Sequence, residues 1–279
     1  TICVRFPVVD GPSEIAGAAV VIWTTTPWTM PGNRAVAVAA DQTYVRLRVT
    51  EAADGTLARV GEEIILALPL VDQVCAEVGI TGREIVGEFP GSVVAGATLS
   101  HPWRGQGYDF DVPVLAANFV EMDTGSGFVH IAPGHGEDDF ILGQQHGIEV
   151  PFTVAENGTF LEHVPLFAGL HVYKADDPVC DAMIAAGALL GRGQITHSYP
   201  HSWRAEAPLI YRNTPQWFIS MDTNNLREKA LASIEQVRWV PNSGRNRIRS
   251  MVENRPAWVV SRQRSCGVPI TVFYDKETS

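Results

Sequence analysis

Three consecutive threonines, Thr24, Thr25 and Thr26, lie where an apolar β-branched run meets a loop rich in proline. The run at residues 18–22 predicts a buried strand, and side chains alternate along a strand, so the hydroxyls would point to both of its faces. The prolines that follow exclude a helix and force a loop. Hydroxyls at such an exposed corner can bind a ligand or position water. A threonine-rich strand edge without function is the alternative.

A second group of chemically active side chains occupies residues 125–139. Gly127 permits a positive φ or a close backbone approach before a predicted strand that contains His130. Asp138 and Asp139 lie in the first turn of a predicted helix, where the helix dipole favours negative charge. Each side chain therefore also has a structural explanation, since a lone histidine in a strand is often a core residue.

The same segment suggests a metal site. His130, His135, Asp138 and Asp139 offer nitrogen and oxygen ligands of the kind that Zn²⁺ or Mn²⁺ accepts. They lack the helical pair of histidines four residues apart that is typical of zinc hydrolases. We therefore predict no metal here, and keep a metal-dependent hydrolase that uses these four residues as an alternative.

Size and composition indicate an ordinary folded protein. The chain has 279 residues, 46% of them hydrophobic and 19% charged, which allows one or two domains with a substantial core. No apolar run approaches the ~20 residues of a membrane span, and the first residues do not resemble a signal peptide. The four cysteines are far apart and form no C-x-x-C pair. We expect a cytoplasmic protein with reduced thiols and no membrane partner.

Charge is distributed unevenly along the chain. Residues 1–191 carry a formal charge of −16, and residues 192–279 carry +6. The acidic part is a poor general binder of polyanions, so any contact with RNA there must be local. The basic part is a better candidate for phosphate contacts, although solvated helix faces would give the same count.

The pattern of elements predicts an α+β protein rich in β-structure. Strands are expected at residues 2–9, 18–25, 34–40, 43–50, 57–60, 64–68, 84–89, 112–119 and 127–131, and helices at 70–78, 136–145 and 178–189, the last with Asp177 as N-cap. Many short strands with Gly and Pro turns indicate a curved or closed, barrel-like β-structure with peripheral helices.

After residue 191 the pattern changes. An aromatic connector at residues 197–204 precedes a strand-like stretch at 209–219, basic helices near 225–236 and 245–254, and a strand, loop and strand over 258–274. This pattern predicts a mixed α/β segment. We place a domain boundary near residue 192, which gives domains 1–191 and 192–279.

Two sequence motifs resemble those of a known family. The string WTTTPWTMPGN at residues 23–33 resembles the threonine-rich motif in the editing domain of isoleucyl-tRNA synthetases, and valyl and leucyl relatives usually carry Arg where Thr26 stands. The string GSGFVHIAPGHGEDD at residues 125–139 resembles the second editing motif of that family. The similarity continues with PHSWR at 200–204, QWF at 216–218 and SRQR at 261–264, so it covers essentially the whole chain.

The resemblance implies roles for individual residues. It implies that Asp139 binds the α-ammonium group of a misattached amino acid, that His130 lines the side-chain pocket, and that the threonines contact the terminal adenosine, the ester carbonyl and the attacking water. The implied catalytic residues are Thr24, Thr25, Thr26, His130 and Asp139, and the implied substrate-binding residues are Trp28, Asn33, Gly127, His135 and Asp138. If so, residues 24–26 and Asp139 should face one cavity.

The implied function is hydrolysis of valine from Val-tRNA(Ile) in a second, smaller pocket, without a cofactor. The longer parent enzyme would join isoleucine to tRNA(Ile) with ATP and Mg²⁺. The non-catalytic alternative is a module that only binds the acceptor end of tRNA. The family's ligase strings, HIGH and KMSKS, do not occur here, so the resemblance implies an inserted editing domain with a flank of the catalytic domain, working with the rest of a synthetase chain.

Two departures from the family pattern affect these expectations. Many relatives have Cys-x-x-Cys where this chain has Ser202 to Ala205, and neither serine nor alanine can supply a thiolate, so no structural zinc is expected at this connector. Cys266 stands where a Trp usually follows the SRQR string. A smaller side chain there puts the usual packing of that corner in doubt.

Overall fold

The structure is a computed structural model that describes residues 1–263, 267–273 and 275. It divides into two compact units, residues 1–213 and 214–279, and each is described on its own. The connector at residues 192–213 thus belongs to the first unit by its contacts. The predicted domain boundary near residue 192 stays a prediction. Among the described residues, no helix is both long and apolar enough to cross a lipid bilayer.

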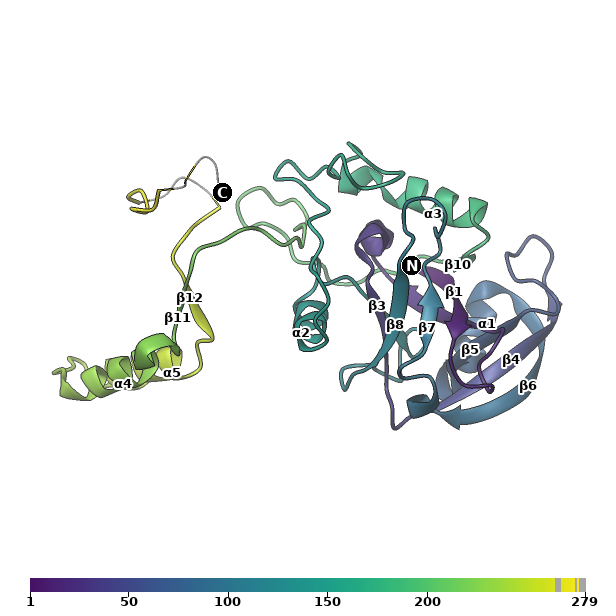
Figure 1. Ribbon diagram of the computed structural model, residues 1–279, viewed down its shortest axis with the longest axis horizontal. Coiled ribbons are helices and arrows are strands. Elements are labelled where there is room, and N and C mark those ends of the chain that lie inside the picture. Colours follow the sequence, from purple (N-terminus) through teal and green to yellow (C-terminus); the bar gives the residue numbers. More distant parts are fainter. Residues whose placement is uncertain (264–266, 274, 276–279) are drawn as a thin grey trace. The chain divides into compact units, whose positions relative to one another are not determined.

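The first unit is built on a closed barrel of six strands. In barrel order these are β2 (Ala19–Thr24), β1 (Ile2–Asp10), β7 (Thr98–Ser100), β8 (Asp111–Ala116), β3 (Ala35–Val38) and β9 (Phe128–Ile131). The last strand, β9, packs back against β2 and closes the barrel. Figure 1 shows β1, β7, β8 and β3 side by side. The α+β, β-rich, barrel-like fold predicted from the sequence is confirmed.

Strand β1 bends from one part of the barrel to the next. Its first half pairs with β2 on one edge and with β10 (Leu189–Arg192) on the other, and its end pairs with β7. Pro7 lies at the change of partner and cannot donate a ladder hydrogen bond there. Residues Ile2 to Phe6 are all buried, because β1 has partners on both edges and a core on both faces.

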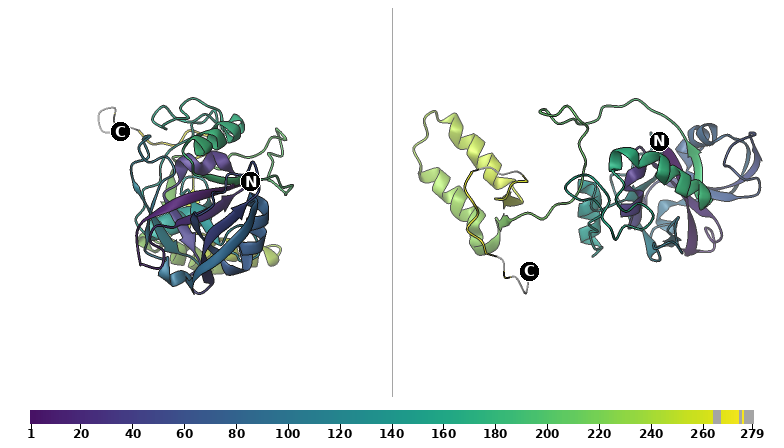
Figure 2. Two further views of the ribbon diagram at one scale, coloured as in Figure 1. Left: turned by 90° about the vertical axis from the view of Figure 1, so that its right-hand side faces the viewer. Right: turned by 90° about the horizontal axis from the view of Figure 1, so that it is seen from above.

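Further strands and helices surround the barrel. The sheet extends from β2 through β5 (Glu63–Ala67) and β4 (Thr43–Ala52) to β6 (Ile80–Pro90). The helices are α1 (Val71–Val78), α2 (Glu137–Gln145) and α3 (Asp176–Ala185), with 3-10 turns η1 (Pro27–Gly32), η2 (Leu68–Leu70), η3 (Gly91–Val93) and η4 (Val172–Lys174). Helix α3 packs on β10 and on η1, outside the barrel (Figure 2).

Several predicted boundaries were wrong. Residues 57–60 form an irregular loop instead of a strand. Helix α3 begins at Asp176, so Asp177 is inside it and Ala175 is the N-cap. The helix ends at Ala185 and not at the predicted residue 189, and residues 189–192 form strand β10, because β1 offers an open edge to pair with. Short β7 gave no pattern in the sequence.

The second unit contains two helices and a two-stranded sheet. Helices α4 (Leu226–Gln236) and α5 (Ser243–Glu253) pack on each other, preceded by η5 (Thr223–Asn225), and β11 (Phe218–Ser220) pairs with β12 (Ala257–Val259). The predicted strand over 209–219 is therefore limited to its last residues. Residues 268–273 are not in a strand, while Cys266 and Tyr274, to which two expectations applied, lie outside the described residues.

A buried ion pair fastens the start of the barrel to its surroundings. Arg5 on β1 makes a bidentate pair with Glu62, at 2.7 and 2.9 Å, and donates to the carbonyl oxygens of Leu189 and Leu57. Because the guanidinium is almost fully buried, its charge depends on these partners. One side chain thereby joins β1, β10 and the loop before β5.

Arg5→Met should lower the free energy of unfolding by about 3–5 kcal/mol, because it leaves the Glu62 carboxylate with little compensation. Arg48, whose pair with Glu63 is partly exposed, provides the control, and Arg48→Met should cost about 1 kcal/mol or less. Urea unfolding measures both variants. If both variants lose the same unfolding free energy, burial of the Arg5–Glu62 pair does not increase its contribution to stability.

Candidate functional site

The threonine motif forms a tight corner at the end of β2. The backbone N–H of Thr26 donates to Thr24 Oγ1 at 3.2 Å, and the two hydroxyl oxygens are 3.3 Å apart. The 3-10 turn η1 follows at once and begins with Pro27, whose fixed φ suits that position. Within the described residues, Thr25 Oγ1 has no hydrogen-bond partner. Thr25 is therefore the threonine whose hydroxyl is available to a ligand.

A chain of hydrogen bonds joins this corner to His130. Asn33 Nδ2 lies 3.2 Å from His130 Nδ1, Thr29 Oγ1 lies 2.8 Å from His130 Nε2, and Thr29 Oγ1 donates to the carbonyl oxygen of Thr26 at 2.9 Å. An amide nitrogen only donates, so Nδ1 accepts and Nε2 carries the proton. We call this series, from Asn33 through His130 and Thr29 to Thr26, the relay.

His130 is buried and neutral. Burial, and to a smaller extent His135, lowers the pKa of His130 to about 3. Both of its ring nitrogens are occupied by the relay, so in this arrangement it holds the corner in place and has no nitrogen free to take a proton from water. The sequence placed His130 in the site. The structure shows that it acts on the threonines through Thr29.

Thr29 was missed by the sequence analysis. Its hydroxyl accepts from His130 and donates to Thr26, and its backbone N–H also donates to the Thr26 carbonyl at 3.1 Å. The signal was present, since Thr29 lies three residues after Thr26, one turn of a 3-10 helix. Pro27 and Pro31 predict a loop at this position, whereas the structure has the 3-10 turn η1.

Asp139 lies at the other side of the second motif. The backbone N–H of Ala132 donates to Asp139 Oδ2 at 2.7 Å, which ties the first turn of α2 to the end of β9. Burial raises the pKa of Asp139 to about 6, against the lowering effect of that hydrogen bond. Asp138 is exposed on the same turn. A partly buried carboxylate with a raised pKa is suited to binding a cation such as an ammonium group.

Two cavities meet the threonine corner. One, of about 240 Å³, is lined by Thr24 and Thr25, by residues 124–129, and by Trp23, Phe119, Val120 and Glu121. The other, of about 390 Å³, is lined by Thr25, Thr26 and Trp28. Asp139 lines neither, so the prediction that residues 24–26 and Asp139 face one cavity is not met by either of them.

Gly127 must be glycine for the first cavity to form. Its φ is +82°, and a Cβ there would lie 2.2 Å from the Cβ of Ala67. Tyr44 holds the same turn by donating to the Gly127 carbonyl oxygen at 2.6 Å. The Ala67 N–H also donates to the Ser126 carbonyl oxygen. These contacts hold residues 125–127, which line the first cavity, against the end of β5.

His135 has a supporting position. Its Nδ1–H donates to the Tyr211 carbonyl at 2.8 Å, and its Nε2 accepts from Thr153 Oγ1 at 2.8 Å. Its ring packs edge-on against Trp28, and Gly32 leaves room for it. His135 thus ties η1 to two distant segments.

The candidate metal set is not assembled. Both ring nitrogens of His130 and of His135 are engaged in the hydrogen bonds given above. In the part of the chain that the structure describes, no group of three or more His, Cys, Asp or Glu side chains is arranged to hold a metal ion. The arrangement therefore favours chemistry by hydroxyls, backbone groups and a carboxylate.

The fold and the two motifs define a class of protein. The family profile of tRNA synthetases class I (I, L, M and V) matches residues 15–279, and the chain belongs to this family. Its relatives include isoleucine–tRNA ligases. That of Gluconobacter oxydans (strain 621H) is 48% identical over 100% of this chain and 30% of the relative, and that of Shewanella pealeana is 45% identical over 99% and 29%. The chain thus spans about 30% of the length of these relatives.

Solved structures share the fold of the first unit. A crystal structure titled GlLeuRS-CP1 matches with a TM-score of 0.52 at 13% identity, over 67% of this chain and 96% of that one. The editing domain of the P. knowlesi cytosolic leucyl-tRNA synthetase matches with a TM-score of 0.50 at 8% identity, over 68% and 96%. At such identities the likeness shows the fold. The predicted relationship to isoleucyl-tRNA synthetases is confirmed.

Thr29→Val keeps the shape of the side chain and removes its hydroxyl, which leaves the buried Nε2–H of His130 without an acceptor. The free energy of unfolding should fall by about 1–3 kcal/mol. Thr98→Val, on β7, should change it by about 0.5 kcal/mol or less, because no hydrogen bond of its hydroxyl is lost. If both variants unfold at the same urea concentration as the parent chain, the relay does not stabilise the corner.

The free energy of unfolding should depend on pH, and the contributions of the buried histidines and of Asp139 to this dependence should have opposite signs. Burial lowers the pKa values of His130 and of His101, which follows β7 and is also buried, from the ordinary 6.5 to about 3. The stability that these two histidines contribute is therefore present above pH 6.5 and is lost as the pH falls toward 3. The pKa of Asp139, about 6, lies above the ordinary 3.8, so protonation of Asp139 favours the folded chain as the pH falls through 6.

Asp139→Asn removes the opposing contribution. The loss of unfolding free energy between pH 6 and 4 should therefore become steeper, by at most about 1.4 kcal/mol per pH unit. Urea unfolding at several pH values measures the slope, with Asp54→Asn on an exposed turn as the control. An unchanged slope in Asp139→Asn would contradict the raised pKa of this carboxyl.

Proposed function

We propose that the first unit hydrolyses the ester of a misattached amino acid, and that its substrate is Val-tRNA(Ile). The observation that carries the proposal is the relay. It joins the two motifs and leaves the Thr25 hydroxyl open in a cavity beside Gly127. Family membership and the editing-domain fold support this context.

The reaction needs little more than orientation. An aminoacyl ester is already activated, so a positioned water and donors toward the carbonyl oxygen can suffice. In the proposed reaction, water adds to the ester carbonyl, the bond to the ribose oxygen breaks, and valine leaves the tRNA. Thr25 and the backbone of the corner bind the ester and the water. The role proposed for Asp139, which is ionised near neutral pH, is to bind the α-ammonium group, and that cation would in turn stabilise the carboxylate. Asp139 lines neither of the two cavities, so the ammonium group would bind outside them.

Selectivity follows from size. In an apolar pocket, one methylene changes the binding free energy by only about 1–3 kcal/mol. This magnitude was established for enzymes of this family that discriminate isoleucine from valine. A second, smaller pocket can correct the remaining error. His130 lines neither cavity, so in the cavity of about 240 Å³ selection by size would come from the side chains that line it, among them Phe119, Val120 and Phe128.

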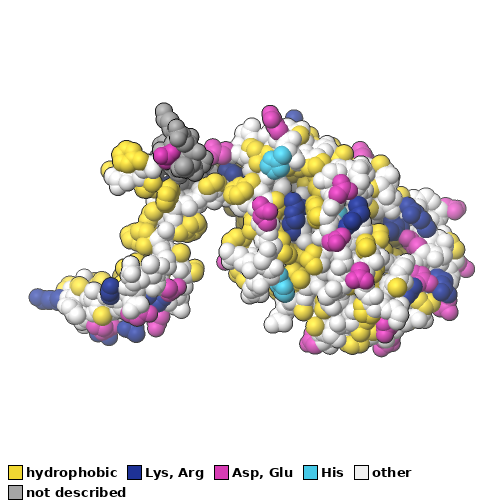
Figure 3. Space-filling view, in the orientation of Figure 1, with side chains coloured by type: hydrophobic (Ala, Val, Ile, Leu, Met, Phe, Trp, Pro, Cys, Tyr) yellow, Lys and Arg dark blue, Asp and Glu magenta, His cyan; other side chains and the backbone are white. Residues whose placement is uncertain are grey.

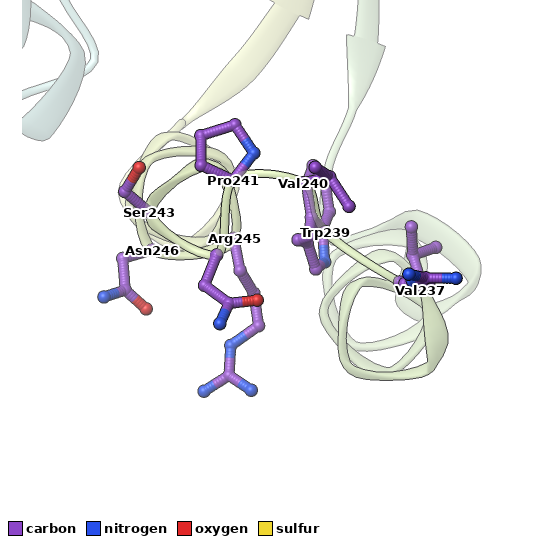
Figure 4. Close-up of a pocket in the computed structure, with 9 residues that line it drawn as sticks. Val237, Trp239, Val240, Pro241, Ser243, Arg245 and Asn246 are labelled. Carbon is purple, nitrogen blue, oxygen red and sulfur yellow. The ribbon is translucent and has the colours of Figure 1, made fainter.

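A cavity in the second unit supports a second candidate function, in which the chain binds RNA without cleaving the ester. A cavity there, of about 770 Å³, is lined by the segment between α4 and α5 and by Arg238, Arg245 and Asn246 (Figure 4). Arg245 also pairs with Glu235, so its charge is partly compensated. Figure 3 shows acidic side chains among basic ones over the visible face of the first unit, and residues 1–191 carry a formal charge of −16, so any contact with phosphate there must be local.

Asp139→Ala should reduce the rate of deacylation of Val-tRNA(Ile) by about 10- to 100-fold, because a charge-assisted hydrogen bond to the ammonium group is lost. Glu137→Ala is the matched control, an exposed acid on the same turn that should keep full activity. The assay compares release of valine and isoleucine from tRNA(Ile), with and without a chelator.

Each outcome separates the candidates. Release of valine but not isoleucine, insensitive to chelator, supports editing. Loss with chelator would favour the metal-dependent hydrolase instead. Binding of tRNA without release would favour the module. Full activity of Asp139→Ala would remove the role given to that carboxylate.

A further inference from the structure

The cavity of about 390 Å³ beside the threonine corner has an unused set of aromatic and polar side chains. Besides Thr25, Thr26 and Trp28, it is lined by Tyr173 and Asp176 from η4 and α3, and by His197, Tyr199 and His201 from the connector. We call it the aromatic cavity. It lies wholly within the first unit, and it shares Thr25 with the smaller cavity in which the ester is placed.

The histidines of the aromatic cavity present acceptors. His197 Nδ1 lies 3.1 Å from the Ser198 carbonyl oxygen, and His201 Nδ1 lies 2.8 Å from that of Tyr199. A carbonyl oxygen only accepts, so Nδ1 carries the proton in both rings. In each neutral ring Nε2 is then an acceptor, and no described residue hydrogen-bonds it.

The tyrosine hydroxyls are acceptors too. Tyr173 donates its hydroxyl proton to the Pro208 carbonyl, and Tyr199 donates to that of Leu209 at 2.9 Å. Each phenol oxygen therefore has only lone pairs left for a ligand. Tyr173 is 53% exposed, so part of its ring is open to solvent beside the cavity.

Asp176 adds a carboxylate to this wall. Burial raises its pKa, and a hydrogen bond from the Trp28 backbone opposes the rise. The carboxylate can accept further hydrogen bonds and would repel a phosphate group. The aromatic cavity is therefore complementary to a flat group that donates hydrogen bonds, and it is a poor site for the backbone of a nucleic acid.

We propose that the aromatic cavity binds the amino-bearing base of the nucleotide that precedes the terminal adenosine, which in tRNA is a cytosine. The proposal rests on the proposed function, which places the ester of the terminal adenosine at Thr25. Carboxylates accept from the N4 amino group of cytosine, and aromatic side chains stack on bases. Uracil presents an O4 acceptor in place of that amino group, so Asp176 would disfavour it.

The test compares the affinities of adenosine and of the dinucleotides CpA and UpA for the 279-residue chain, by NMR titration. CpA should bind about tenfold more tightly than adenosine, and more tightly than UpA. Asp176→Asn retains an acceptor for the Trp28 N–H but can donate to O4, so it should remove the preference for CpA over UpA. Asp177→Asn, next to it but paired with Arg192 and not lining the cavity, should change nothing. Tyr199→Ala should weaken both dinucleotides equally.

Equal affinities of adenosine, CpA and UpA would overturn the proposal, and persisting deacylation would then show that only the proposal fails. If deacylation is absent while CpA is preferred in an Asp176-dependent manner, the proposal holds and the proposed function fails. Valinamide provides an ammonium probe. Valinamide binding that Asp176→Asn abolishes, with CpA unaffected, would assign the aromatic cavity to an ammonium group and overturn the proposal.

Discussion

The relay between the two motifs is the interaction on which the candidate site depends. Residues 24–33 and His130 are about a hundred residues apart. Two buried hydrogen bonds bring them together, one donated by Asn33 to His130 Nδ1 and one accepted by Thr29 from His130 Nε2–H. An imidazole in such a place is stable only when it is neutral and fully paired. Burial keeps the pKa of His130 near 3, so the ring is neutral and has one donor and one acceptor nitrogen. This sets the direction of each hydrogen bond in the relay.

The closed barrel makes the relay possible. Strand β9 carries His130 and pairs with β3, while its other side packs on β2, whose end carries the threonines. Gly127 allows the segment before β9 to approach Ala67 at the end of β5, since any larger residue would strain the backbone and clash. Arg5 secures the opposite edge of β1 through Glu62 and β10. The site is thus a consequence of closure and not of the motifs alone.

The threonine corner separates two kinds of surface. On the side of Gly127 the cavity is small and lined partly by apolar side chains such as Trp23, Phe119 and Phe128, which suits discrimination by size. On the side of Asp176 the cavity is larger and lined by aromatic rings and acceptors, which suits recognition of a base. Thr25 belongs to both, and its free hydroxyl stands between them. An editing reaction at this site would depend on the orientation of the ester and the water, and it would not require a strong general acid or base.

The sequence by itself determined the β-rich class, the residues of both motifs and the family, because strand periodicity, Gly and Pro turns and the motif strings are local properties. Tertiary structure decided the rest. Residues 189–192 became a strand because β1 had an open edge, Thr29 entered the site because η1 turned it toward His130, and Asp139 was kept out of both threonine cavities by its bond to Ala132. These outcomes depend on partners far away in the chain, and no local pattern contains them.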